Sequence, residues 1–130
     1  MGAWETDLIG NDEVQDFFID IEEIIGIEDL SILIIEKECN KIKNIFLKKR
    51  NEILSTALNY EQEVILSYIG LLKIMNIEIN NDEKKHFAKA LKYEYERINS
   101  WDEPDLRKSY LKALEVAIKE NTEYNFSMKI

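Results

Sequence analysis

The sequence predicts an all-α fold, and three observations support this prediction. Glycine occurs four times and proline once in 130 residues, too few for the many turns of a β-sandwich or barrel. Apolar residues make up 45% of the chain, enough to bury a core without disulfides or metal. In most segments these residues recur at steps of three and four, which is helical spacing. We predict one helical domain over residues 1–130, a compact bundle of about five helices.

The first predicted helix covers about residues 11–25 and is acidic. Asn11 precedes it as an N-cap residue, and Gly26 follows as a stop. The acids that crowd its first turn suit the positive end of the helix dipole. Its apolar residues form one stripe that faces the core: Val14, Phe17, Phe18, Ile21, Ile24 and Ile25.

The next segment, residues 30–36 with the sequence LSILIIE, fits either a buried helix or a short strand. An apolar run of this length has no periodicity that separates the two structures. Both alternatives stay open from the sequence alone.

The rest of the chain shows helical spacing. Apolar residues recur at helical steps around residues 42–46, 60–75 and 80–98, and Pro104 begins a last helix that reaches Ile118. Asn80 or Asn81 caps the helix over 80–98. We expect the polar tail from about residue 121 to be loosely held.

The charge is divided unevenly along the chain. Residues 1–40 contain twelve acids and one base, Lys37, for a balance of −11. Residues 41–130 contain fourteen acids and sixteen bases, a balance of +2, and the two sum to the net charge of −9. This composition argues against direct binding to nucleic acid or to an anionic membrane. It favours attraction to a basic partner.

Four acids of the first predicted helix recur at helical spacing, so they form one line of like charge: Glu13, Asp16, Asp20 and Glu23. No base interrupts this line, and like charges at this spacing weaken a helix slightly. A solvated face that keeps the protein soluble is one interpretation. The other is a binding face for a cationic partner, because a helix tuned for stability alone would gain from basic residues between the acids.

The sequence contains no complete motif that is typical of a catalytic or metal site. The one histidine, His86, follows Glu83 in an E-x-x-H pattern, but a di-iron bundle needs a second copy of it. We interpret Glu83 as the capping-box partner of Asn80 and His86 as an ordinary surface or boundary residue. The single cysteine, Cys39, excludes an internal disulfide and fits a reducing compartment. We expect no catalytic residue, cofactor or metal site.

Two stretches resemble a small bacterial family known as domain of unknown function four-two-five-nine. The opening MGAW, followed by NDEVQDF, carries the family's residues Met1, Gly2, Ala3, Trp4, Asn11, Asp12, Asp16 and Phe17. The later NSWDEPDLRKSYLKALEVAIK resembles the family's closing segment. Glu5 and Asp7 stand where that family usually has glycines. The resemblance implies a mostly helical fold and no established activity.

Two hypotheses follow from these patterns. The first is a small acidic cytoplasmic interaction protein, an immunity protein or inhibitor that neutralises a basic, nuclease-like toxin through Glu13, Asp16, Asp20 and Glu23. The cytoplasmic setting follows from the lack of a basic-then-apolar leader and of a membrane-length apolar run. The alternative is a carboxylate-based enzyme or small-ligand-binding module, which predicts a deep pocket holding an acid of raised pKa.

Overall fold

The computed structural model describes residues 8–130, and these residues form helices and loops without a strand. The α-helices are α1 (Asp12–Ile25), α2 (Leu30–Ile35), α3 (Lys43–Lys48), α4 (Arg50–Ala57), α5 (Gln62–Ile74), α6 (Asn81–Glu96) and α7 (Pro104–Glu120). Two 3₁₀ turns, η2 (Cys39–Ile42) and η3 (Ile98–Ser100), join them. The all-α prediction is confirmed. The predictions that fall on residues 1–7, including Trp4, lie outside the described residues.

The predicted number of helices, about five, is too low, because residues 8–130 form seven α-helices. The difference arises in the first half of the chain. α2 is a separate helix of six residues, and residues 43–57 divide into α3 and α4 at Lys49. The backbone of Lys49 (φ −104°, ψ 9°) lies outside the helical range, which interrupts what helical spacing alone would join.

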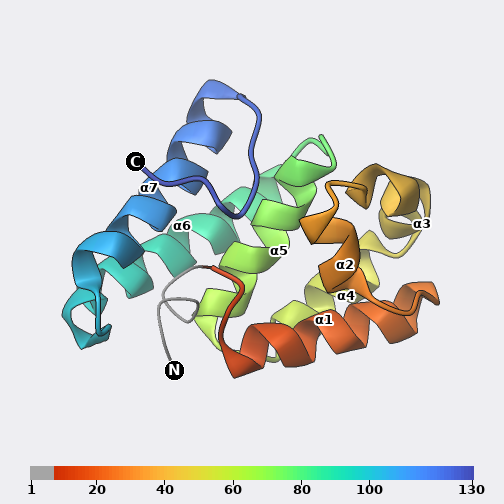
Figure 1. Cartoon of the computed structure of the whole chain (residues 1–130), viewed down its shortest axis with the longest axis horizontal. Coiled ribbons are helices and arrows are strands. Elements are labelled where there is room, and N and C mark those ends of the chain that lie inside the picture. The colour runs from red at the N-terminus through yellow and green to blue at the C-terminus, as the bar shows by residue number, and fades with distance from the viewer. Residues whose placement is uncertain (1–7) are drawn as a thin grey trace.

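Helix α5 forms the centre of the fold (Figure 1). It packs against α1, α4, α6 and α7, and every residue from Val64 to Lys73 is buried. A helix that is apolar on all sides needs neighbours on all sides. α1 and α7 lie at opposite edges of the molecule in Figure 1, so they present separate surfaces.

Residues 30–36 do not form the strand that the sequence left open, and the reason lies in their helix-capping contacts. The side chain of Asp29 accepts a hydrogen bond from the backbone amide of Ile32 (3.2 Å). A carboxylate oxygen of Glu22, on α1, accepts a second from the amide of Leu30 (2.8 Å). Amides at a helix N-terminus have no partner within the helix, so these two acids favour α2 over a strand.

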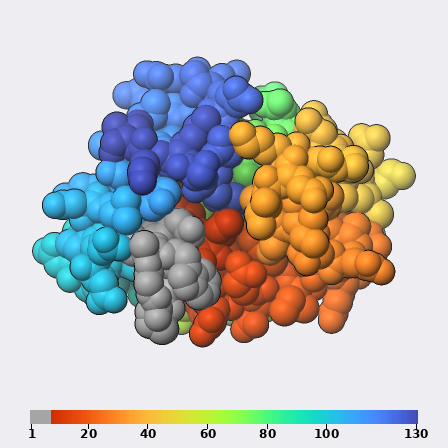
Figure 2. Space-filling model, viewed as in Figure 1, coloured from red at the N-terminus to blue at the C-terminus, as the bar shows by residue number. Residues whose placement is uncertain are grey.

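The tail after α7 packs onto α5. Tyr124 and Phe126 are buried there. Their rings pack edge to face, with the ring centroids 5.7 Å apart. Gly70 makes the approach feasible, because a Cβ atom at this position would lie 2.5 Å from a ring carbon of Phe126. In the space-filling view the tail covers the middle of the molecule beside α2 (Figure 2). The segment that we expected to be loosely held therefore contributes two aromatic side chains to the core.

Candidate functional site

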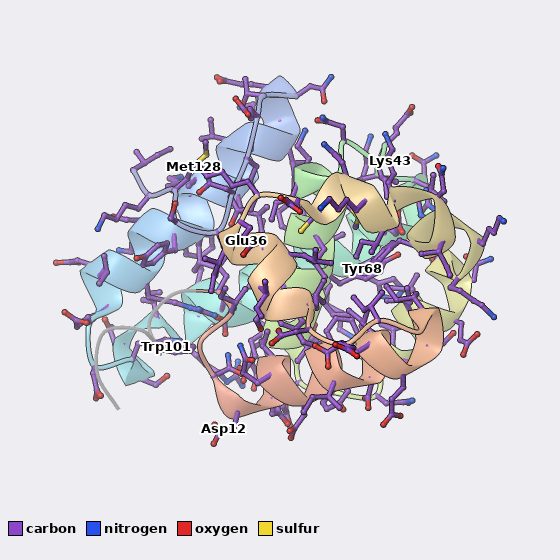
Figure 3. All side chains as sticks on the ribbon, turned by 45° about the vertical axis from the view of Figure 1, so that its right-hand side comes forward. Asp12, Glu36, Lys43, Tyr68, Trp101 and Met128 are labelled. Carbon is purple, nitrogen blue, oxygen red and sulfur yellow. The ribbon has the colours of Figure 1, made fainter. Side chains whose placement is uncertain are left out.

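The outer face of α1 is the candidate site, and the structure divides its four predicted residues into two kinds. Asp16 and Glu23 are exposed, whereas Glu13 and Asp20 are half-buried. The residues of α1 that are fully exposed follow steps of four, three and four along the helix: Asp12, Asp16, Ile19 and Glu23. Figure 3 shows Asp12 at the start of this line, pointing away from the body of the protein. Ile19, with 51% of its surface exposed, places one apolar side chain among the acids.

Tyr60, which the sequence did not single out, belongs to the same face. Its hydroxyl group donates a hydrogen bond to the Asp20 carboxylate. Its ring packs edge-on against the Phe17 ring, with the ring centroids 6.0 Å apart. The hydrogen bond to Asp20, followed by burial and the charges of Asp20, Asp16 and Glu13, raises the pKa of Tyr60 to about 12. The charges of three of the four predicted acids thus act on one tyrosine, whose ring packs against Phe17.

A second acidic group adjoins this face at the start of α5. Burial, with the charges of Glu94 and Glu13, raises the pKa of Glu63 to about 7, although the Arg107 guanidinium opposes the shift. One carboxylate oxygen of Glu13 is buried and accepts no hydrogen bond from the described residues. Glu13 therefore lies between the exposed acids of α1 and a half-buried carboxyl group that titrates near neutral pH.

No basic side chain compensates the acids of α1 within the described part of the chain. The ion pairs found there all join residues of other segments: Lys41 with Glu38, Lys49 with Glu52, Arg50 with Glu83, His86 with Asp82, and Arg107 with Glu94. An acidic face that is not neutralised from within attracts cations from outside the protein.

Two buried ion pairs stabilise the helices behind this face. Arg107 of α7 pairs with Glu94 of α6, both almost fully buried, and the guanidinium lies 3.9 Å from the centre of the Trp101 ring. Trp101, beside Pro104, is therefore a packing residue at the start of α7. The pair joins α6 to α7. Its two charges also act on the pKa of Glu63, which adjoins the acidic face.

The second pair is built on Glu83. Its carboxylate completes the predicted capping box with Asn80 (2.8 Å and 3.0 Å), and it also accepts hydrogen bonds from Arg50 and from the hydroxyl of Tyr68. Burial opposes its ionisation, but the hydrogen bonds from Arg50 and Tyr68 outweigh burial and lower the pKa of Glu83. The Arg50 and Tyr68 contacts come from α4 and α5, too distant in sequence for a local pattern to predict.

The remaining candidates offer less chemistry. His86 is half-buried, with a ring nitrogen 3.8 Å from Asp82 on the same helix. Cys39 is buried, and burial raises its thiol pKa to about 11, so it is a poor nucleophile. Within residues 8–130, no three His, Cys, Asp or Glu side chains are grouped so as to hold a metal ion. Among the same residues, no helix has the length and apolar character needed to cross a membrane.

Comparison of the chain with protein-family models, curated proteins and solved structures finds no match. The function of the acidic face is therefore argued from its own residues.

Proposed function

We propose that the protein is a small acidic cytoplasmic interaction protein, most simply an immunity protein or inhibitor that binds and neutralises a basic, nuclease-like toxin. The observation that carries this proposal is the outer face of α1, where exposed acids have no ion-pair partner among the described residues and the half-buried Asp20 accepts a hydrogen bond from Tyr60. The residues assigned to binding are Glu13, Asp16, Asp20 and Glu23, joined by Tyr60.

Charge and aromatic surface have different roles in such an interface. Complementary charge accelerates encounter and selects a basic partner, whereas desolvated aromatic and aliphatic side chains supply most of the affinity. Asp16 and Glu23 suit the first role because they are exposed. Tyr60 and Ile19 suit the second role. The Tyr60 ring packs against Phe17, and about half of the Ile19 surface is exposed, on the same face as the acids.

The mechanism of inhibition would be steric and electrostatic. A nuclease contacts the phosphates of its substrate through Lys and Arg. The carboxylates of α1 would pair with those cations and cover the surface on which the nucleic acid binds. The protein would need no catalytic group for this task.

The alternative, a carboxylate-based enzyme or small-ligand-binding module, has one specific observation in its favour. Glu63 is a half-buried acid whose pKa is raised to about 7, as expected of a general acid or base. However, Glu63 lines neither of two cavities that lie near the C-terminal end of α5. Its neighbour Glu94 is already paired with Arg107. The interaction function is therefore favoured.

The test uses two double variants that change the net charge equally. Asp16→Asn with Glu23→Gln neutralises the exposed line, and both side chains are free of hydrogen bonds that hold the fold. The control is Glu96→Gln with Glu120→Gln, two exposed acids of α6 and α7. Each protein serves as bait for affinity capture from cells of the source organism, followed by mass spectrometry and a nuclease assay of the captured protein.

We expect the native protein and the control to capture one basic protein with nuclease activity and to inhibit it. The α1 variant should lose both capture and inhibition. Equal capture by all three proteins would place the interface elsewhere, and inhibition unaffected by the α1 variant would contradict the proposal.

A further inference from the structure

A pair of neighbouring cavities lies where the C-terminal ends of three helices meet, and no residue of α1 lines either of them. The first, of about 420 Å³, is open to the surface and is lined by residues of α2, the end of α5 and the tail over residues 123–127. The second, of about 610 Å³, is also open and is lined by the end of α5, the loop over 76–79, Lys84 of α6 and the end of α7. Lys73 and Asn76 line both. In Figure 2 the tail and α2 face each other, with α5 visible between them.

The backbone around these cavities has an unusual conformation. The three described non-glycine residues with positive φ all line them: Lys37 (59°), Asn76 (55°) and Asn121 (53°). Each follows the end of a helix, α2, α5 or α7 respectively. Asparagine adopts this conformation readily, but for lysine it is uncommon and costs energy. Lys37 is thereby held at the wall of the first cavity.

Lys73 is the central residue of the pair of cavities. Only 8% of its surface is exposed, yet no carboxylate of the described residues lies within ion-pair distance of its ammonium group. Its one hydrogen bond joins Nζ to the side-chain oxygen of Asn121 at 3.2 Å. An ammonium group has three donors, so two have no acceptor in the described chain.

The helix ends account for part of this arrangement. Helix C-termini carry partial negative charge, which favours a cation at their meeting point. They do not supply acceptors for the two remaining donors, because Lys73 Nζ makes no hydrogen bond to a backbone carbonyl of residues 8–130. An acceptor from outside the protein, placed in a cavity that Lys73 lines, would complete the group's hydrogen bonds.

The wall of the first cavity determines what kind of ligand would supply that acceptor. Ile34, Ile74 and Phe126 give it an apolar side, and Lys37 is a second cationic residue of the same wall. Glu123 is the one acid of this wall among the described residues. The volume falls within the range of small-molecule sites, which combine apolar walls with a few polar groups.

We propose that this cavity binds a small amphipathic carboxylate. The carboxylate would accept hydrogen bonds from Lys73 and Lys37, and the apolar portion would lie against Ile34, Ile74 and Phe126. The site is independent of the acidic face, because no residue of α1 takes part in it.

The test uses octanoate as the probe and octylammonium, which has a similar chain and the opposite charge, as its control. Binding to the ¹⁵N-labelled full chain is followed by amide chemical shifts and by calorimetry. We expect saturable shifts for octanoate at residues around the first cavity, and no saturable binding of octylammonium. Equal binding of both probes, or shifts scattered over the surface, would overturn the proposal.

Two variants locate the charge that binds. Lys73→Met keeps the length of the side chain and removes the ammonium, so octanoate affinity should fall by about tenfold or more, as expected when a charge-assisted hydrogen bond is lost. Lys84→Met, which lies on the second cavity only, should bind octanoate as the native chain does. Native affinity in Lys73→Met would mean that Lys73 is structural. If that variant does not fold, the comparison of the two probes on the native chain decides the question.

Discussion

The hydroxyl group of Tyr60 donates a hydrogen bond to the carboxylate of Asp20, forty residues away in sequence. This contact joins the loop before α5 to the middle of α1. It has two consequences. One acid of the predicted binding line is held in place by a neighbour, and an aromatic ring becomes part of a surface that the sequence presents as purely acidic.

Removing the Tyr60 hydroxyl tests this contact. Tyr60→Phe should lower the free energy of unfolding by about 1 kcal/mol, the value of a typical hydrogen bond to a partly exposed acceptor. Tyr93→Phe is the matched control, because Tyr93 is also half-buried but its hydroxyl makes no hydrogen bond in the structure. Urea denaturation measures both variants. A midpoint for Tyr60→Phe that equals the Tyr93→Phe midpoint would contradict the contact.

The titration of Tyr60 gives a second readout. Its pKa is raised from 10.0 to about 12, so the stability that its neutral form provides is fully present below pH 10 and is lost as the pH rises towards 12. We expect one tyrosine of the native protein to ionise near pH 12 in ultraviolet absorbance, and this transition should disappear in Tyr60→Phe. An unchanged titration curve would show that another tyrosine accounts for the transition.

Glu63 predicts a pH dependence of the opposite kind from a salt-bridged acid. Its pKa rises from 4.5 unfolded to about 7 folded, so the folded state binds the extra proton between these values. Stability from this group is therefore present below pH 4.5 and is lost as the pH rises through 7. Glu63→Gln should gain about 1 kcal/mol over the native chain at pH 8, after allowance for solvent screening.

The measurement for Glu63 is urea denaturation of both proteins at pH 5 and pH 8. The difference between the variant and the native chain isolates Glu63 from other titrating groups. It should be larger at pH 8 than at pH 5. A difference that is equal at the two values, or larger at pH 5, would contradict the raised pKa.

The sequence predicted the parts of the fold that depend on neighbours along the chain. The cap at Asn11, the left-handed stop at Gly26 and the capping box of Asn80 with Glu83 are local contacts, and each is present. The secondary structure of residues 30–36 depends in part on Glu22, a residue of another helix. Periodicity along the chain could therefore not decide between a helix and a strand.

In the candidate site too, the sequence predicted the features that depend on neighbours along the chain and not the contacts between helices. Helical spacing placed the acids of α1 on one outer face, but it did not show that Asp20 is bonded to Tyr60 or that Glu13 adjoins Glu63. These neighbours come from the start of α5 and meet α1 only after folding.

The buried carboxylate of Glu83 predicts a large effect of Arg50. Arg50→Met removes the guanidinium that pairs with Glu83 and leaves a buried charge with fewer partners. Loss of one partner of a buried pair costs about 3 to 5 kcal/mol, and the partly exposed side chain of Arg50 places this case at the lower end. Arg97→Met, an exposed arginine over the Tyr93 ring, should change stability by less than about 0.5 kcal/mol. Thermal or urea unfolding distinguishes the two; equal losses would contradict the pairing.

Gly70 and Phe126 should be energetically coupled. Alanine suits a helix better than glycine by about 1 kcal/mol, yet Gly70→Ala would place Cβ 2.5 Å from the Phe126 ring. We expect a net loss of about 1 kcal/mol, because overpacking of a buried contact outweighs the gain in helix propensity. Combined with Phe126→Leu, which shortens the facing side chain, Gly70→Ala should cost less than it does alone. Additive losses would show that the tail does not press on α5 at this position.

If the exposed acids of α1 guide a basic partner to the protein, the association rate constant with that partner, measured by stopped flow from low to high NaCl, should depend strongly on salt. We expect this rate constant to fall by about tenfold or more for the native protein and for Glu96→Gln/Glu120→Gln, because salt screens exposed charges. The Asp16→Asn/Glu23→Gln variant should associate more slowly at low salt and respond less to salt. A native rate that does not depend on salt, or the same dependence in all three proteins, would contradict the claim.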